Sequence, residues 1–93
     1  MKQVELDDVK EKALSLAGKT LKTRHRGARF HVRVGPEGLI YTPMSSGKPR
    51  SNNDWQTIQR VLDRFNGLQS FFPSDYMDLS WHAPYLLVII HSI

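Results

Sequence analysis

Hydrophobic and polar residues follow one another along this chain with two different periods. Near the N-terminus, apolar residues recur three or four positions apart, at Leu6, Val9, Ala13, Leu16 and Ala17. This spacing places them on one face of a helix. Asp7 and Asp8 lie in the first turn, where acidic side chains favour the positive end of the helix dipole. Gly18 is a common stop, so the pattern predicts a helix over residues 5–17.

The central part of the chain has the period of β-strands. Its clearest strand alternates three apolar with three polar residues, Phe30, Val32 and Val34 with Arg29, His31 and Arg33. One face of that strand is therefore apolar and the other cationic. A shorter alternation precedes it at residues 21–24, and β-prone residues 39–42 follow a turn at residues 35–38. We expect three antiparallel strands joined by short turns.

A second helix is predicted after a loop over residues 44–53. Ser51 can cap it, with Asp54 in the capping-box position. Its apolar face consists of Trp55, Ile58, Val61, Leu62 and Phe65. The pair Asn66-Gly67 is a strong signal for its end.

The remaining residues, 68–93, are harder to interpret. Residues 68–83 are irregular and rich in aromatic side chains. Pro84 suits the first turn of a helix, whereas the β-branched residues that follow it favour a strand. We favour a short buried helix here and keep the strand as the alternative.

These elements predict an α+β fold with the order helix, strand, strand, strand, helix. It has a three-stranded antiparallel sheet, two helices, and an irregular C-terminal extension that ends in a short buried helix or strand. The length of 93 residues fits a single domain over residues 1–93. The chain contains no cysteine, which excludes disulfides and thiolate sites.

The location of the protein is predicted from its apolar segments. The N-terminus lacks the apolar segment of a signal peptide. The longest apolar run, Leu86–Ile90, is too short to span a bilayer. We therefore expect a cytoplasmic protein that has no membrane partner.

Positive charge is concentrated in the middle of the chain. The net charge is +4, and residues 19–50 hold eight of the 13 lysine and arginine residues but a single acidic residue, Glu37. Both flanking segments are mildly acidic. Charge segregated in this way attracts polyanions such as nucleic acids, although it is also typical of a solvated sheet face that keeps a small protein soluble.

The basic residues fall into two candidate groups. Arg24, Arg26, Arg29 and Arg33 are expected on the sheet, where a cationic stripe can follow a phosphate backbone. Lys48 and Arg50 lie in a serine- and glycine-containing loop that is expected to enter the second helix, and a helix N-terminus favours anions. The loop lacks the first glycine of a Walker A motif, so ATP hydrolysis is disfavoured.

The aromatic C-terminal segment is a second candidate surface. Aromatic side chains often anchor protein interfaces, and this segment offers Phe71, Phe72, Tyr76 and Trp81. The alternative is that these rings close over the core of a small domain.

Catalytic chemistry has little support in the sequence. The four histidines, His25, His31, His82 and His91, show no compact spacing of metal ligands. His25 or His31 can be imagined as the general base of a small ribonuclease, with arginines steadying a phosphate. We nevertheless assign no catalytic residue, no metal site and no cofactor.

The order of elements resembles that of double-stranded-RNA-binding domains and of the small HicA-type toxins that share their topology. The resemblance covers residues 5–66, including the Phe30-x-Val32-x-Val34 strand and the Ser46–Arg50 loop. It implies phosphate contacts from Lys48, Arg50 and Asn52 at a helix start. This chain departs from those families by lacking the lysine cluster there and by its tail. In size, it also resembles small proteins of phages, integron cassettes and other mobile elements.

The sequence thus predicts a small, non-enzymatic module that binds nucleic acid or another polyanion through a basic sheet face and a basic loop. One alternative is a protein-interaction module of a mobile element, acting as a homodimer or with another protein. Another is a small ribonuclease toxin.

Overall fold

A computed structural model describes residues 3–24 and 26–93, without the side chains of residues 51 and 52. The elements occur in the following order: α1 (Leu6–Leu16), β1 (Leu21–Lys22), β2 (Arg29–Val34), β3 (Gly38–Pro43), β4 (Arg50–Asp54), α2 (Trp55–Leu68), the 3₁₀ turn η1 (Pro73–Asp75) and α3 (Ala83–His91). The α+β class is confirmed.

The sheet has four strands in sequence order, and each neighbouring pair is antiparallel. The prediction of three strands was wrong because it treated residues 50–53 as loop. These residues form most of β4, which pairs with β3 through Leu39 opposite Asn53 and Gly38 opposite Asp54. The register shifts between Leu39 and Tyr41, so the ladder is irregular between the two ends of this pairing.

The helix α1 begins and ends within one residue of its predicted bounds. Its first turn is fixed by the backbone N–H of Glu5, which donates to the Asp8 carboxylate at 2.9 Å. The preceding residue, Val4, is buried, and its backbone exchanges two hydrogen bonds with the side-chain amide of Asn66 in α2. The N-terminal segment is therefore tied to the second helix.

The helix α2 begins later than the sequence suggests. Asp54, rather than Ser51, is its N-cap, and the Asp54 carboxylate accepts a hydrogen bond of 2.7 Å from the backbone N–H of Thr57. The helix passes through Gly67 and ends at Leu68, where Gln69 adopts the left-handed conformation with φ of 54°. The predicted stop at Asn66-Gly67 was thus about one residue early.

The C-terminal apolar run is the helix α3, as we favoured, and it joins the two predicted helices in the described part of the chain. Pro84 lies in its first turn, where a missing backbone N–H has no cost. Five of its nine residues are buried, namely Ala83, Leu86, Leu87, Ile89 and Ile90.

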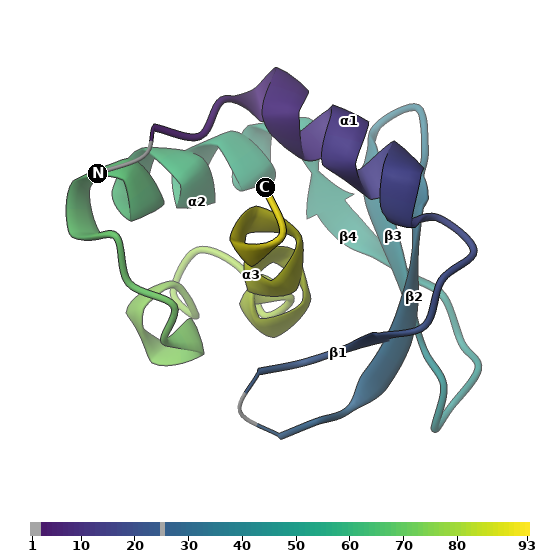
Figure 1. Ribbon diagram of the computed structural model, residues 1–93. Helices are drawn as coiled ribbons and strands as arrows, with labels where there is room; N and C mark the ends of the chain where they lie inside the picture. Colours follow the sequence, from purple (N-terminus) through teal and green to yellow (C-terminus); the bar gives the residue numbers. More distant parts are fainter. Residues whose placement is uncertain (1–2, 25) are drawn as a thin grey trace.

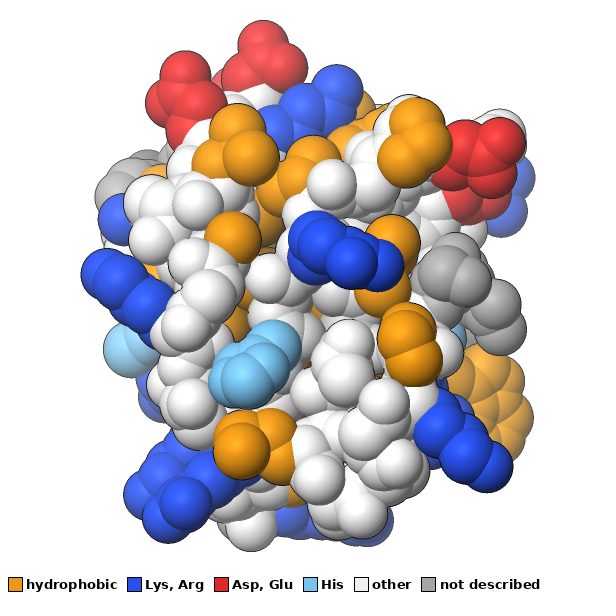
Figure 2. Space-filling model, turned by 90° about the vertical axis from the view of Figure 1, so that its right-hand side faces the viewer, with side chains coloured by type: hydrophobic (Ala, Val, Ile, Leu, Met, Phe, Trp, Pro, Cys, Tyr) orange, Lys and Arg blue, Asp and Glu red, His pale blue; other side chains and the backbone are white. Residues whose placement is uncertain are grey.

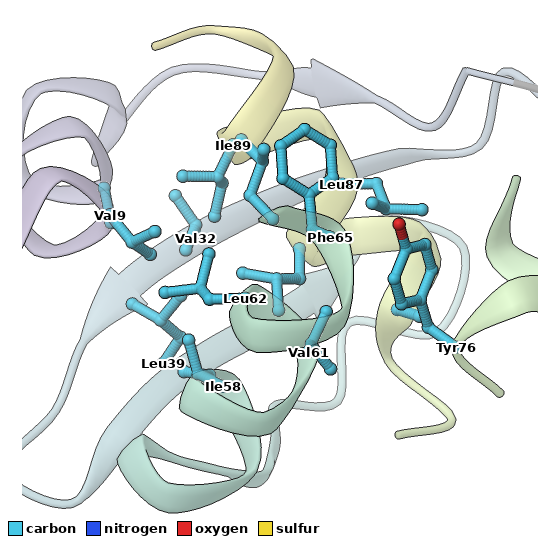
Figure 3. Packing of buried hydrophobic residues seen from close by; sticks show 14 of the residues in the cluster. Val9, Val32, Leu39, Ile58, Val61, Leu62, Phe65, Tyr76, Leu87 and Ile89 are labelled. Atoms are coloured by element: carbon cyan, nitrogen blue, oxygen red, sulfur yellow. The ribbon is translucent and has the colours of Figure 1, made fainter. Parts of the chain in front are cut away.

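The helices all lie on one side of the sheet (Figure 1). A single cluster of buried apolar side chains fills the space between them, with Val32 and Leu39 from the sheet meeting Ile58 and Leu62 of α2 (Figure 3). Because no helix covers the other side in Figure 1, that side of the sheet is left open. Among the described residues, no helix is both long and apolar enough to cross a membrane.

Candidate functional site

The open face of the sheet carries the cationic residues of β2. Phe30 and Val32 point into the core, whereas Arg29, His31 and Arg33 are exposed on the opposite side. This alternation follows directly from the two-residue period of a strand. The predicted cationic strand face is therefore present.

Neighbouring strands extend this face. Lys22 of β1 lies directly opposite Arg29, and Ile40 of β3 lies opposite Arg33. Figure 2 views the molecule from the side on which the sheet lies in Figure 1. It shows lysine and arginine side chains spread over the face and its rim, with acidic side chains at the upper edge. We name Lys22, Arg29, His31 and Arg33 the sheet-face cluster.

No carboxylate of the described residues forms an ion pair with the sheet-face cluster. In the described part of the chain, one ion pair is formed, between Arg64 and Asp78 at 2.6 Å, and both of these residues lie outside the sheet. Like charges directly opposite each other in a sheet are destabilising. The exposed Lys22–Arg29 pair therefore costs the protein some stability.

The structure separates Arg24 and Arg26 from this face. Both line a groove of about 530 Å³ at the end of the β1–β2 hairpin. Tyr85 and Leu87 of α3 also line it, so it opens on the helical side of the sheet. The four arginines predicted on one sheet surface thus lie in two places, with Arg29 and Arg33 on the open face.

The aromatic segment forms the other wall of the same groove. Phe72 is 62% exposed and Trp81 is 82% exposed. Phe71 lies deeper, packed edge-on against Phe65 with a centroid distance of 5.2 Å, and Arg24 lies over its ring at 5.1 Å. Two of the predicted basic residues and three of the predicted aromatic residues therefore line one groove, although the two groups lie far apart in the sequence.

Tyr76 does not belong to this surface. Its side chain is buried, and its hydroxyl donates a hydrogen bond of 2.7 Å to the backbone carbonyl of Ser70. The expectation that Tyr76 contacts a partner is corrected accordingly, because a ring with no exposed surface is not available for contact. The alternative prediction, that the aromatic side chains pack on the core, is confirmed for Tyr76.

The basic loop does not enter a helix. Lys48 lies in the connection between β3 and β4, and Arg50 is the first residue of β4. The N-terminus of α2 is occupied by the Asp54 carboxylate instead, and hydrogen bonds from Thr57 lower the pKa of that group. The prediction that this loop forms an anion site at a helix start is therefore wrong. The side chain of Asn52, which the family resemblance added to that site, lies outside the described residues.

Arg50 lies near His82, a residue to which the sequence assigned no role. Partial burial lowers the pKa of His82, and the positive charge of Arg50 lowers it further. The backbone N–H of His82 donates to the Ser80 hydroxyl at 3.1 Å. The Ser80 hydroxyl itself donates to the side-chain oxygen of Asn53 in β4 at 3.2 Å, so a hydrogen bond links β4 to the segment preceding α3.

The remaining histidines of the described residues do not belong to a group of metal ligands. His31 is exposed, and its Nε2 lies 3.2 Å from the Thr20 hydroxyl. The ring of His91 packs edge-on against Phe71 at 5.1 Å, and His25 lies outside the described residues. Across residues 3–24 and 26–93, no three histidine, cysteine, aspartate or glutamate residues come together as metal ligands would.

Comparisons with models of protein families, with curated proteins and with solved structures found no match to this chain. The sheet-face cluster and the groove are therefore the features of the molecule that bear on its function.

Proposed function

We propose that this chain binds nucleic acid, and that the open face of its sheet holds the phosphate backbone. Lys22, Arg29 and Arg33 supply the positive charge, and His31 lies among them. The observation that carries the proposal is the Lys22–Arg29 register, which keeps two like charges opposite each other on an exposed face. Bound phosphate would turn that repulsion into attraction.

The length of the cluster favours an extended polyanion over a single phosphate. Arg29 and Arg33 are four residues apart on one strand, which corresponds to about 13 Å. One phosphate group cannot contact both side chains at that distance without strongly bending them toward each other. A chain of phosphates can, and it needs no sequence readout to do so.

Charge outside the cluster supports the same proposal. The sequence pI is about 9.7, and a basic domain of this kind attracts nucleic acid over a Debye length. Lys48 and Arg50, although not at a helix start, are exposed at the β3–β4 end of the sheet. They add to the long-range attraction without being part of the cluster.

The first experiment is a fluorescence anisotropy titration with short labelled oligonucleotides at low salt. Duplex and single-stranded forms of both DNA and RNA are compared. We expect binding that weakens steeply as salt rises, because phosphate contacts release counterions. Failure of all four oligonucleotides to bind at low salt would refute the proposed function.

A further inference from the structure

The groove at the end of the β1–β2 hairpin joins two kinds of side chain that the sheet face does not combine. One wall carries Arg24 and Arg26, and the other carries Phe72 and Trp81. Its volume of about 530 Å³ falls within the range of roughly 300–1,000 Å³ that is usual for small-molecule sites. A more open hollow of about 360 Å³ shares Arg24 and Phe72, so the concave region continues past the arginine.

The exposure of Trp81 needs a reason. It is the most exposed large hydrophobic side chain in the described chain, at 82%, and Phe72 on the same wall is 62% exposed. Scattered exposed apolar residues are ordinary on protein surfaces. Two aromatic rings that line one groove are instead a surface on which a planar ring can stack.

The charge of the groove selects an anionic ligand. Asp75 and Asp78 are nearby in sequence, but neither lines the groove. The Asp78 carboxylate pairs with Arg64, and the Asp75 carboxylate accepts a hydrogen bond from the Ser70 hydroxyl. Among the described residues, the charged side chains that line the groove are the two arginines. A ligand with an aromatic ring and an adjacent anionic group matches both walls.

We propose that this groove receives an unpaired base of a single-stranded nucleic acid. Trp81 and Phe72 stack on the base, and Arg24 and Arg26 contact the phosphates beside it. This inference rests on the proposed function and adds to it a preference for single strands over duplexes. A base inside a duplex is already stacked and cannot enter without being extruded, so the groove favours single strands.

The hairpin makes this arrangement continuous with the sheet face. Lys22 and Arg29 lie at the paired part of the hairpin, while Arg24 and Arg26 lie at its end. One strand of nucleic acid that passes around the β1 edge can therefore contact the sheet-face cluster and place a base in the groove. Aromatic stacking combined with a cationic path is typical of single-strand binding.

A second copy of this chain fits the groove less well. Each copy has a net charge of +4, and pairing through the groove would bring Arg24 and Arg26 against another basic molecule. Juxtaposed like charges oppose association. A peptide partner remains an outcome that the experiments below distinguish.

The first test measures the affinity of the full chain and its variants for single-stranded and duplex oligonucleotides. Trp81→Ala and Phe72→Ala should each weaken single-strand binding by roughly five- to a hundredfold, the usual effect of losing a stacking partner, and should leave duplex binding unchanged. Leu14→Ala is the matched control, since Leu14 is 63% exposed on α1 and should change neither affinity.

A second measurement uses the wild-type chain and does not depend on variants that fold. Its two tryptophans give two indole N–H signals in an NMR spectrum. The Trp55 indole donates to the carbonyl of Pro36 at 3.2 Å, and Trp55 does not line the groove. Short oligothymidylate or oligouridylate should shift the Trp81 signal and leave the Trp55 signal in place, while a phosphodiester polymer without bases should shift neither.

The outcomes separate this proposal from the proposed function. Single-strand binding that survives Trp81→Ala unchanged, or an unmoved Trp81 signal, overturns the groove proposal and leaves the sheet-face proposal standing. A Trp81 signal moved by an acidic or proline-rich peptide but not by oligonucleotides overturns it in favour of a protein partner. Self-association of the wild-type chain that Trp81→Ala abolishes overturns the groove proposal in favour of a homodimer. No binding to any nucleic acid refutes both proposals.

Discussion

The side-chain amide nitrogen of Asn53 donates a hydrogen bond of 2.6 Å to the phenol oxygen of Tyr41, and neither residue has exposed surface. The Ser80 hydroxyl donates in turn to the side-chain oxygen Oδ1 of Asn53 at 3.2 Å. Burial raises the pKa of Tyr41, so the phenol stays neutral. Three segments, β3, β4 and the turn before α3, are therefore joined by one small buried network.

Removing the centre of this network should destabilise the fold. Asn53→Ala leaves both the Tyr41 and the Ser80 hydroxyl without this partner, and each buried polar group left unpaired costs roughly 1–3 kcal/mol. We expect the free energy of unfolding, measured by urea titration with circular dichroism, to fall by about 2–4 kcal/mol. The exposed Gln56→Ala serves as the control; an Asn53→Ala loss no larger than that of Gln56→Ala would contradict this role.

Two glycines should respond in opposite directions to alanine. A Cβ atom on Gly38 would lie 2.1 Å from the backbone oxygen of Asn53, so β3 and β4 would have to separate. We expect Gly38→Ala to cost at least the roughly 1–3 kcal/mol of ordinary overpacking.

Gly67 is the matched comparison. It lies inside α2, and a Cβ there would meet nothing within 4 Å. Gly67→Ala should raise the free energy of unfolding by about 0.5–1 kcal/mol, because alanine loses less backbone entropy in a helix. Thermal unfolding of both variants measures the contrast; equal effects would mean that β3 and β4 do not approach as closely as described.

His82 should make stability depend on pH. Burial and the nearby Arg50 lower the pKa of His82 from its ordinary value of 6.5. As the pH falls through that value, the unfolded chain binds a proton that the folded chain does not. The stability that the neutral His82 contributes is therefore complete above pH 6.5, the ordinary pKa of histidine. It decreases as the pH falls below that value and is lost as the pH falls through the lower pKa of His82 in the folded chain.

The measurement is an NMR titration of the His82 ring, together with urea unfolding between about pH 7 and pH 5. Arg50→Gln should move the pKa of His82 upward, toward its ordinary value. His82→Gln should flatten this part of the stability profile. An unchanged His82 pKa in Arg50→Gln would show that the two side chains do not interact.

Much of the fold could be predicted because its elements have strong local patterns. The alternation in β2 and the apolar faces of α1 and α2 specify both the type and the buried side of each element. The strand β4 could not be predicted, because its polar sequence has low β-propensity. Its pairing depends on tertiary contacts, namely the ladder with β3 and the hydrogen bond from the buried Asn53 amide to Tyr41.

The candidate site was predictable in part for the same reason. Arg29 and Arg33 follow from strand alternation, which is local. The meeting of Arg24 with Phe71 depends on how the hairpin and the C-terminal segment pack, and no sequence spacing encodes that contact. Tyr76 was assigned to a candidate surface because it lies in an irregular, aromatic-rich segment, and the backbone carbonyl that accepts its hydrogen bond has no signature in the sequence.

The central claim, that the open sheet face binds phosphates, is tested most directly by the salt dependence of binding. The double variant Arg29→Gln/Arg33→Gln is compared with Lys12→Gln/Arg60→Gln, which removes the same charge from the helices α1 and α2. Each lost phosphate contact lowers the slope of log affinity against log salt by about 0.7–0.9. We predict a lower slope for the sheet variant and the wild-type slope for the helix variant. Equal slopes in the two variants would contradict the account.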